Sequence, residues 1–266
     1  MDRLATYVDA WKRSAADVEE LLRSLGEHDW DRGTDCPQWS VRDIAAHLAA
    51  LESELAGDAG PRVDQHAAAT ASVASAYTQA GIDERRDRTP AELIDEFVHA
   101  VHRRAVELDA DPPSDPEGTP PRNVGGTGWD WQTLLRNRVV DLWVHEQDIR
   151  RAVGGPGDLD TPAAQVTRAT FVGALPYVIG KRAGAPPGST VAVELDGEEL
   201  AFVVDDEGRC RPTDDKLESA TARLTMGTET FTILSAGRRD PLTVDVRVAG
   251  DRELAERILQ GMAVTV

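Results

Sequence analysis

The sequence predicts an α + α/β protein with two domains: an N-terminal four-helix bundle over residues 1–156, and a small α+β domain with a mainly antiparallel sheet over residues 157–266. Before residue 155, apolar residues recur in four long stretches at the spacing of amphipathic helices. After residue 188, apolar and polar residues alternate, which is typical of half-buried strands. A chain of 266 residues is long enough to form a core in each domain.

The first two helices each carry a single apolar stripe. One helix is expected over residues 1–25. The second should begin after Ser40 and end near Leu55, because Ser40 and Asp43 have the spacing of a capping box. His47 falls on the same stripe as the leucines of this second helix, so its side chain is expected to point toward the core.

The next part of the chain predicts two more long helices, separated by a loop. A helical stretch is expected over residues 66–86, and a long helix begins at Thr89, where Glu92 completes a capping box. Residues 109–128 are rich in Pro, Asp and Gly and are expected to form either a loop that lines a site or a plain exposed loop. The fourth long helix covers residues 130–153 and is ended by glycine and proline.

The C-terminal third predicts a small sheet with helices packed on it. A helix is expected over residues 161–179. Residues 191–195 and 200–204 alternate in polarity on either side of Asp196-Gly197, which predicts a β-hairpin. The remaining expected elements are strands over 222–226 and 242–248, a helix over 229–236 capped by Thr228, and a final helix capped by Asp251.

Charge and composition exclude several classes of function. The net charge is −18, so the surface should repel nucleic acid and anionic membranes, and no binding to either is expected. No apolar run is long enough to span a membrane, and the beginning of the chain lacks the apolar region of a signal peptide. Cys36 and Cys210 are too few for a disulfide framework and are interpreted as reduced thiols. A cytoplasmic protein, monomeric or dimeric, is expected.

Three polar residues on the apolar stripes suggest a metal site. Asp141 and His145 are four residues apart and therefore lie side by side on one helical face, where both could bind one ion. His47, from the second helix, would complete a set of two histidines and one carboxylate, which leaves a coordination position open. The simpler alternatives are a core histidine at position 47 and a hydrogen-bonded Asp141–His145 pair. Arg138 could neutralise Asp141 as a salt bridge, and Asp148 could either orient an imidazole or form a solvated ion pair.

Two segments resemble signatures of a known family. The segment from Cys36 to Leu48, CPQWSVRDIAAHL, and the segment from Arg138 to Gly154, RVVDLWVHEQDIRRAVG, are similar to motifs of the DinB-like, mycothiol-dependent maleylpyruvate isomerase family. The C-terminal stretches FTILSAGR, which ends at Arg238, and VAGDRELA are similar to its smaller, sterol-carrier-like second domain. The resemblance therefore extends over nearly the whole chain.

The resemblance implies a divalent metal, zinc or else nickel or iron, held by His47, Asp141 and His145. It also implies an isomerase or an S-transferase that uses mycothiol as a thiol cosubstrate and acts on a small electrophile. The isomerase itself has Glu where this chain has Asp141, and the shorter side chain could mark a different substrate, a different metal or a weakened site. Arg238 is the candidate for binding an acidic substrate, because a dianion would need an arginine near the site of so acidic a protein.

Two other functions stay open at this point. A metal-dependent hydrolase would use the open position for water in place of a thiol. A protein without enzymatic activity would use the metal to stabilise the bundle and would bind an apolar ligand in the C-terminal domain. Turnover without added thiol would favour the first of these, and a long apolar tunnel in the second domain would favour the other.

Overall fold

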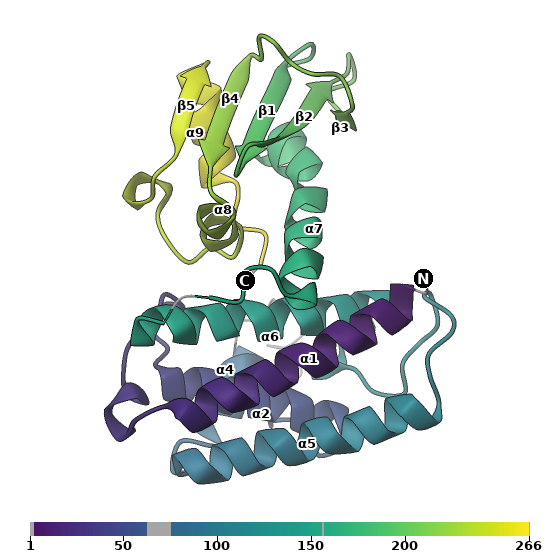
Figure 1. Ribbon diagram of the computed structural model, residues 1–266. Coiled ribbons are helices and arrows are strands. Elements are labelled where there is room, and N and C mark those ends of the chain that lie inside the picture. The colour runs from purple at the N-terminus through teal and green to yellow at the C-terminus, as the bar shows by residue number, and fades with distance from the viewer. Residues whose placement is uncertain (1–2, 63–75, 156, 266) are drawn as a thin grey trace. The chain divides into compact units, whose positions relative to one another are not determined.

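The computed structural model describes residues 3–62, 76–155 and 157–265. The contacts of the chain divide it into two compact units, Met1–Thr167 and Arg168–Val266. The first unit is helical and the second contains a five-stranded sheet with helices, so the predicted two-part α + α/β fold is confirmed (Figure 1).

In the described residues of the first unit, the four long predicted helices are present together with one short helix. The helices are α1 (Arg3–Ser24), α2 (Val41–Leu55), α4 (Ala76–Asp83), α5 (Pro90–Ala110) and α6 (Trp131–Val153). The short helix α4 falls inside the stretch 66–86 that the sequence predicts to be helical, and the part of this stretch before residue 76 lies outside the described residues. Helix α1 packs against α6, and α2 packs against α5 (Figure 1).

Helices α2 and α5 begin where their capping boxes predict. The Ser40 hydroxyl accepts a hydrogen bond from the backbone N–H of Asp43, and the Asp43 carboxylate accepts one at 2.8 Å from the backbone N–H of Ser40. Thr89 and Glu92 make the same reciprocal pair at the start of α5. Because these caps fix where the helices start, they also fix which α2 residues face the core, His47 among them.

The core of the first unit lies between the four long helices. Trp11 from α1 and Trp143 from α6 are fully buried, and so are Ile44 and Leu48 on either side of His47 in α2. Burial of an aliphatic or aromatic side chain of this size stabilises a fold by about 1.5–3 kcal/mol. The packed side chains on either side of His47 therefore restrict the position of its helix and of its imidazole.

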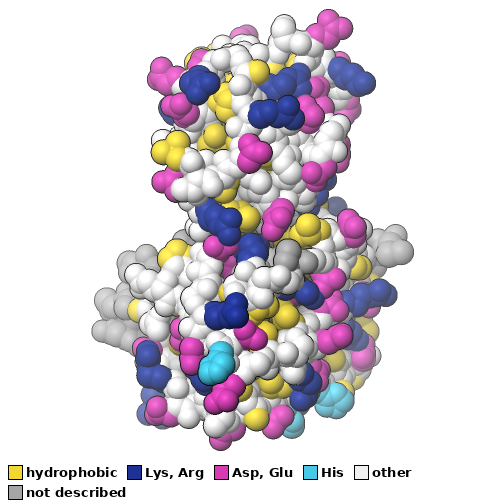
Figure 2. Space-filling view, turned by 60° about the vertical axis from the view of Figure 1, so that its left-hand side comes forward, with side chains coloured by type: hydrophobic (Ala, Val, Ile, Leu, Met, Phe, Trp, Pro, Cys, Tyr) yellow, Lys and Arg dark blue, Asp and Glu magenta, His cyan; other side chains and the backbone are white. Residues whose placement is uncertain are grey.

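The surface carries charges of both signs. Acidic and basic side chains are interspersed over the face of the molecule in Figure 2, with acidic residues in excess in the whole sequence, 47 against 29. Among the described residues, no helix combines the length and the apolar character needed to cross a lipid bilayer.

The second unit contains one mixed sheet and three helices. Its elements are α7 (Pro162–Tyr177), which begins in the first unit and continues as a π-helical turn over Val178–Arg182, β1 (Thr190–Leu195), β2 (Glu198–Val204), β3 (Cys210–Thr213), β4 (Ala222–Met226), α8 (Thr228–Ser235), β5 (Arg247–Gly250) and α9 (Arg252–Gln260). Inside this unit, Phe171 of α7 and Phe231 of α8 meet edge to face with ring centroids 6.5 Å apart.

The strand order is β3-β2-β1-β4-β5. Strands β1 and β4 pair in parallel, and the other three neighbouring pairs are antiparallel, which confirms the predicted mainly antiparallel sheet. The predicted hairpin is present, with Leu195 opposite Glu198 across the Asp196-Gly197 turn. Helix α9 packs against β4, β5 and the π-helical turn (Figure 1).

Three details of the second unit differ from the prediction. The expected strand 242–248 is instead a 3-10 turn over Pro241–Thr243 followed by β5, and Leu242 is 89% exposed, so its apolar character does not mark a buried strand. Strand β3 was not predicted, because it is a short, largely polar edge strand that contains Pro212. Helix α8 has Gly227 as its N-cap, in place of the predicted Thr228.

Gly250 is expected to be essential to the end of β5. Its φ angle is +80°, and a Cβ atom there would lie 2.3 Å from the carbonyl oxygen of Thr221. Gly250→Ala should therefore destabilise the second unit by about 1–3 kcal/mol, the usual cost of a strained backbone conformation. Gly173→Ala is the matched control: nothing lies near its added Cβ inside α7, and it should be neutral or stabilising. Calorimetric unfolding of the two variants measures the change in stability. Equal losses of stability in Gly250→Ala and Gly173→Ala would contradict the prediction.

Candidate metal centre

The structure brings together the three residues that the sequence singles out. His47 lies on α2, and Asp141 and His145 lie one turn apart on α6. One ligand atom from each residue lies within 4.8 Å of the other two. The packing of α2 against α6 therefore creates the constellation, and neither helix provides it alone.

The Asp141 carboxylate lies between the two imidazoles. Its Oδ1 atom is 3.3 Å from Nε2 of His47 and 3.6 Å from Nε2 of His145. The two imidazole rings are 4.9 Å apart between centroids and inclined at 68° to each other. The shorter aspartate thus reaches both histidines across the two helices. Two imidazole nitrogens and a carboxylate oxygen that converge in this way are a ligand set suited to zinc, nickel or iron.

The two histidines of the candidate site are buried, and the aspartate is partly exposed. His47 and His145 are 4% and 5% exposed, while 27% of the Asp141 side chain is open to solvent. A site that is enclosed by protein and open at one ligand matches the catalytic type of zinc site better than the closed structural type.

Trp39 covers the two histidines. Its ring lies 5.1 Å from that of His47 and stacks at 29° to that of His145, with 5.7 Å between centroids. The indole N–H bonds to the side-chain oxygen of Gln79 on α4. The structure thus places the Trp39 ring against both imidazoles.

Asp148 orients the imidazole of His145. Its Oδ2 atom lies 3.2 Å from Nδ1 of His145, and its Oδ1 atom accepts a hydrogen bond of 2.6 Å from Arg151. Because Nδ1 is engaged by a fully buried carboxylate, Nε2 is the nitrogen directed at Asp141. This arrangement favours the first of the two roles that the sequence left open for Asp148. Nδ1 of His47, in contrast, is buried and has no hydrogen-bond partner among the described residues.

Cys36 is a neighbour of the site that the sequence reasoning did not single out. Its thiol, a ring nitrogen of His145 and a carboxylate oxygen of Asp148 form a second group whose ligand atoms all lie within 4.8 Å of one another, and all three residues are buried. The available signal was its place in the segment CPQW, three residues before Trp39. His145 is therefore shared by two groups of metal-binding side chains.

Arg138 and Glu52 support Asp141 from the bundle interior. Arg138 donates to Oδ2 of Asp141 at 2.8 Å, which is the salt bridge that the sequence offered as an alternative, and also binds Glu52. Glu52 is fully buried, and the sequence reasoning missed it. The available signal was its position four residues after Leu48 and three before Leu55, which puts a carboxylate on an apolar stripe.

The contacts within the site lower the pKa of Asp141, and burial lowers the pKa of His47. Burial acts to raise the pKa of Asp141, but its interactions with His47 and Arg138 outweigh burial and hold the pKa well below its usual value. Burial lowers the pKa of His47, which more than offsets the attraction of Asp141. A carboxylate and a neutral imidazole are the protonation states that bind metal.

Arg238 lies in the second unit, directly after α8. It is half-buried, and its guanidinium donates to the carbonyl oxygen of Ala236 at 2.9 Å. Its proposed role toward a substrate stays a prediction.

A family comparison and a comparison with solved structures both find similarity to mycothiol-dependent maleylpyruvate isomerase. The family described as the mycothiol maleylpyruvate isomerase N-terminal domain matches residues 11–150. Among solved structures, the mycothiol-dependent maleylpyruvate isomerase is similar with a TM-score of 0.59 and 14% identity, and a histidine-to-alanine mutant of that enzyme with a TM-score of 0.58 and 13% identity. Each of these alignments covers 92% of both chains, and identities this low establish the fold alone.

A third structure aligns with a smaller part of the chain. Sterol Carrier Protein 2 Like 2 from Aedes aegypti aligns over 35% of this chain and 96% of its own length, at 17% identity and a TM-score of 0.24. No curated protein sequence matches the chain.

Proposed function

We propose, because the chain belongs to the mycothiol maleylpyruvate isomerase N-terminal domain family, that it is a metal-dependent enzyme with a thiol cosubstrate, of the isomerase or S-transferase type. The thiol we propose is mycothiol, and the other substrate is a small electrophile. The observation that carries the proposal is the convergence of His47, Asp141 and His145 in a site that is open at Asp141. We expect the protein to act in the cytoplasm, as a monomer or dimer.

The residues of the chain would divide the work in the following way. His47, Asp141 and His145 would hold the ion, with Nε2 of His145 directed at the site by Asp148. A bound divalent ion lowers the pKa of a thiol or water that binds to it, and so supplies a nucleophile at neutral pH. Trp39 would exclude water from the imidazole side of the site, since its ring lies against both histidines.

The proposal is tested by measuring metal content and thiol dependence together. Purified protein should contain about one equivalent of zinc, nickel or iron, and turnover of an electrophilic substrate such as maleylpyruvate should require both the metal and added mycothiol. Turnover that needs the metal but no thiol would support a metal-dependent hydrolase instead. Tight apolar-ligand binding without turnover would support a protein that is not an enzyme.

Arg238 is proposed to bind the carboxylate of an acidic substrate. Arg238→Ala should then lower kcat/KM for a dianionic substrate by about tenfold or more, because a hydrogen bond to a charged group contributes roughly 1.5–3 kcal/mol. Metal content should stay at the wild-type level. Arg239→Ala, at the exposed neighbouring position, is the control and should have a small effect. A loss of metal that equals the loss of activity would refute the role in substrate binding.

A further inference from the structure

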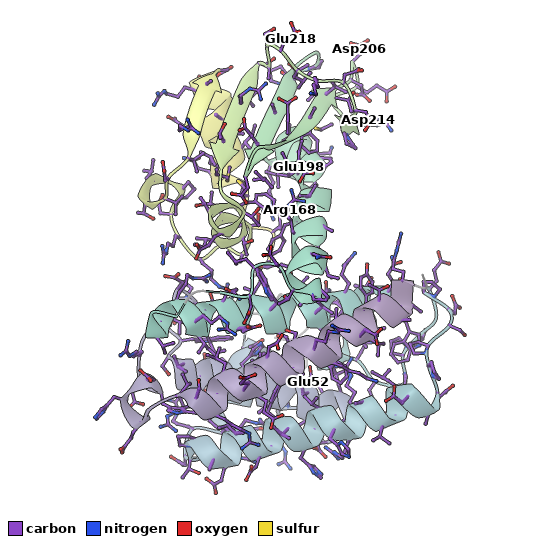
Figure 3. The ribbon with its side chains drawn as sticks, viewed as in Figure 1. Glu52, Arg168, Glu198, Asp206, Asp214 and Glu218 are labelled. Carbon is purple, nitrogen blue, oxygen red and sulfur yellow. The ribbon has the colours of Figure 1, made fainter. Side chains whose placement is uncertain are left out.

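Glu52 of α2 is a buried charge that accepts four hydrogen bonds. Its Oε1 atom accepts hydrogen bonds from the indole of Trp11 at 3.0 Å and from Nε and Nη2 of Arg138 at 3.1 and 2.9 Å. Its Oε2 atom accepts one from Arg104 at 2.9 Å. Glu52 is completely buried, and both arginines are nearly so. Figure 3 labels Glu52 among the helices of the first unit. A carboxylate buried this deeply keeps its charge only because so many donors surround it.

Arg138 extends this network to the candidate metal centre. Its Nη1 atom donates to Oδ2 of Asp141 at 2.8 Å, while Nε and Nη2 are engaged by Glu52. The guanidinium therefore connects the two carboxylates. Both oxygens of Asp141 lie 3.3 Å from Nε2 of His47, and Oδ1 also lies 3.6 Å from Nε2 of His145, so the carboxylate that Arg138 holds through Oδ2 is the one that meets both imidazoles.

The same contacts connect the two helices that carry the site. Glu52 follows His47 on α2, and Arg138 precedes Asp141 and His145 on α6. Aspartate has a single methylene group, so it can reach a histidine on a neighbouring helix only over a narrow range of helix separations. A buried ion pair between those helices, beside the site, restricts that separation.

We propose that Glu52 and Arg138 form a clamp that positions Asp141 as a metal ligand, with Glu52 as a positioning residue. The clamp holds the Asp141 carboxylate through Oδ2, directs it toward the two imidazoles, and keeps α2 and α6 close enough for the short side chain to reach. Glu52 also neutralises Arg138, whose charge would otherwise repel a cation bound at Asp141. This inference rests on the proposed metal site.

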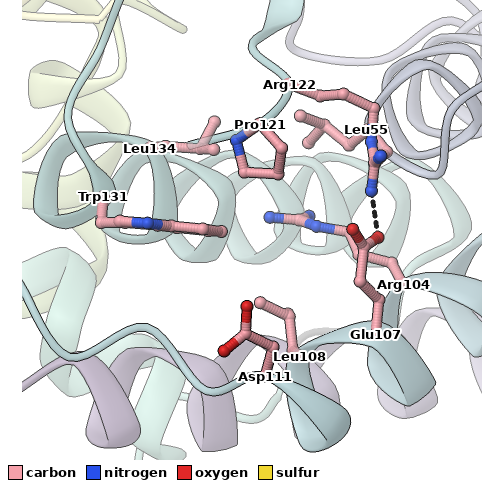
Figure 4. A pocket seen from close by; sticks show the side chains of 9 residues that line it. All are labelled: Leu55, Arg104, Glu107, Leu108, Asp111, Pro121, Arg122, Trp131 and Leu134. Carbon is pink, nitrogen blue, oxygen red and sulfur yellow. Dashed lines mark hydrogen bonds and ion pairs between the residues drawn. The ribbon is translucent and has the colours of Figure 1, made fainter. Parts of the chain in front are cut away.

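Arg104 offers a matched control, because it shares Glu52 but does not contact Asp141. Its guanidinium lies over the ring of Trp11, 4.5 Å from the centroid, and lines a cavity of about 70 Å³ together with Trp131 and Leu134 (Figure 4). A substitution at Arg104 disturbs the same buried carboxylate on the side away from the metal site. Arg104 and Arg138 variants therefore separate a loss of bundle packing from a loss of ligand positioning.

The experiment compares zinc affinity in Arg138→Lys and Arg104→Lys, measured on the full chain by competition with a chromogenic chelator. Lysine keeps the positive charge but lacks the planar guanidinium group, whose several N–H donors let Arg138 bind Glu52 and Asp141 at the same time. Arg138→Lys should weaken zinc binding by about 10- to 100-fold, the usual cost of losing a partner that orients a metal ligand. Arg104→Lys should leave the affinity within about twofold, whatever it does to the unfolding midpoint of the metal-free protein.

Substitution with cobalt supplies a second readout that packing alone would not change. The visible spectrum of the Co²⁺-loaded protein reports the ligand geometry, and it should change in Arg138→Lys and stay the same in Arg104→Lys. If Arg138→Lys does not fold, Glu52→Asp is used instead, because it shortens the clamp by one methylene group and retains every charge. It should lower zinc affinity in the same way.

The possible results distinguish a failure of the clamp proposal from a failure of the proposed metal site. Wild-type zinc affinity in Arg138→Lys, or equal losses in the Arg138 and Arg104 variants, would overturn the clamp while the metal site stands. If the wild-type chain binds no zinc, nickel or iron, the proposed function fails, and the clamp fails with it. Weakened binding together with an altered cobalt spectrum in the Arg138 variant alone supports the proposal.

Discussion

His145→Ala is expected to abolish stoichiometric metal binding while leaving the protein folded. The substitution removes one of three ligands and leaves His47 and Asp141, which face each other across two helices. Because loss of a partner that only orients a ligand costs roughly 10- to 100-fold in metal affinity, loss of the ligand itself should cost more than about 100-fold. Metal content after dialysis and the zinc dissociation constant both measure the effect.

The control for this prediction is His102→Ala. His102 is exposed on α5. That variant should retain the wild-type metal content and affinity. A His145→Ala protein that keeps its metal, with native helix content, would contradict the proposed ligand set. Removal of His145 also frees Asp148, but Arg151 still pairs with that carboxylate, so the end of α6 should remain ordered.

Local sequence signals were sufficient for most of the fold. The caps at Ser40 and Thr89 predict where two helices begin, because a capping box involves only residues three positions apart. The Asp196-Gly197 turn predicts the hairpin for the same reason. Strand β5 was misplaced because Leu242 looks like the start of a buried strand and is exposed, and local polarity does not reveal which face of a segment is covered.

The candidate site was predictable in part for a different reason. Asp141 and His145 are neighbours on one helix, so their proximity follows from spacing alone, and His47 is found because it falls on the apolar stripe of its own helix. Cys36 and Glu52 could not be found in this way. Their proximity to the site depends on how the segment before α2, and α2 itself, pack against α6, and no spacing rule within one element encodes that packing.

Glu52→Ala is expected to destabilise the first unit by about 3–5 kcal/mol, the usual cost of removing one partner of a buried ion pair. The substitution leaves Arg104 and Arg138 without the carboxylate that they share and leaves the indole N–H of Trp11 without an acceptor. All six tryptophans precede residue 144, so the midpoint of urea unfolding followed by tryptophan fluorescence reports the first unit alone. Glu19→Ala, which removes the half-buried partner of the exposed Arg23, should change stability by less than about 1 kcal/mol.

The pH dependence distinguishes a charge effect from a simple loss of packing. Burial acts to raise the pKa of Glu52, but Arg104, Arg138 and the Trp11 hydrogen bond outweigh it and lower the pKa below its usual value. A depressed pKa contributes stability that is fully present above the unfolded-state value of about 4.3, and this contribution is lost as the pH falls through the folded-state value. The stability difference between wild type and Glu52→Ala should therefore be constant near neutral pH and shrink below about pH 4. A difference that does not change down to the acid limit would mean that Glu52 stabilises the bundle by its volume and not by its charge.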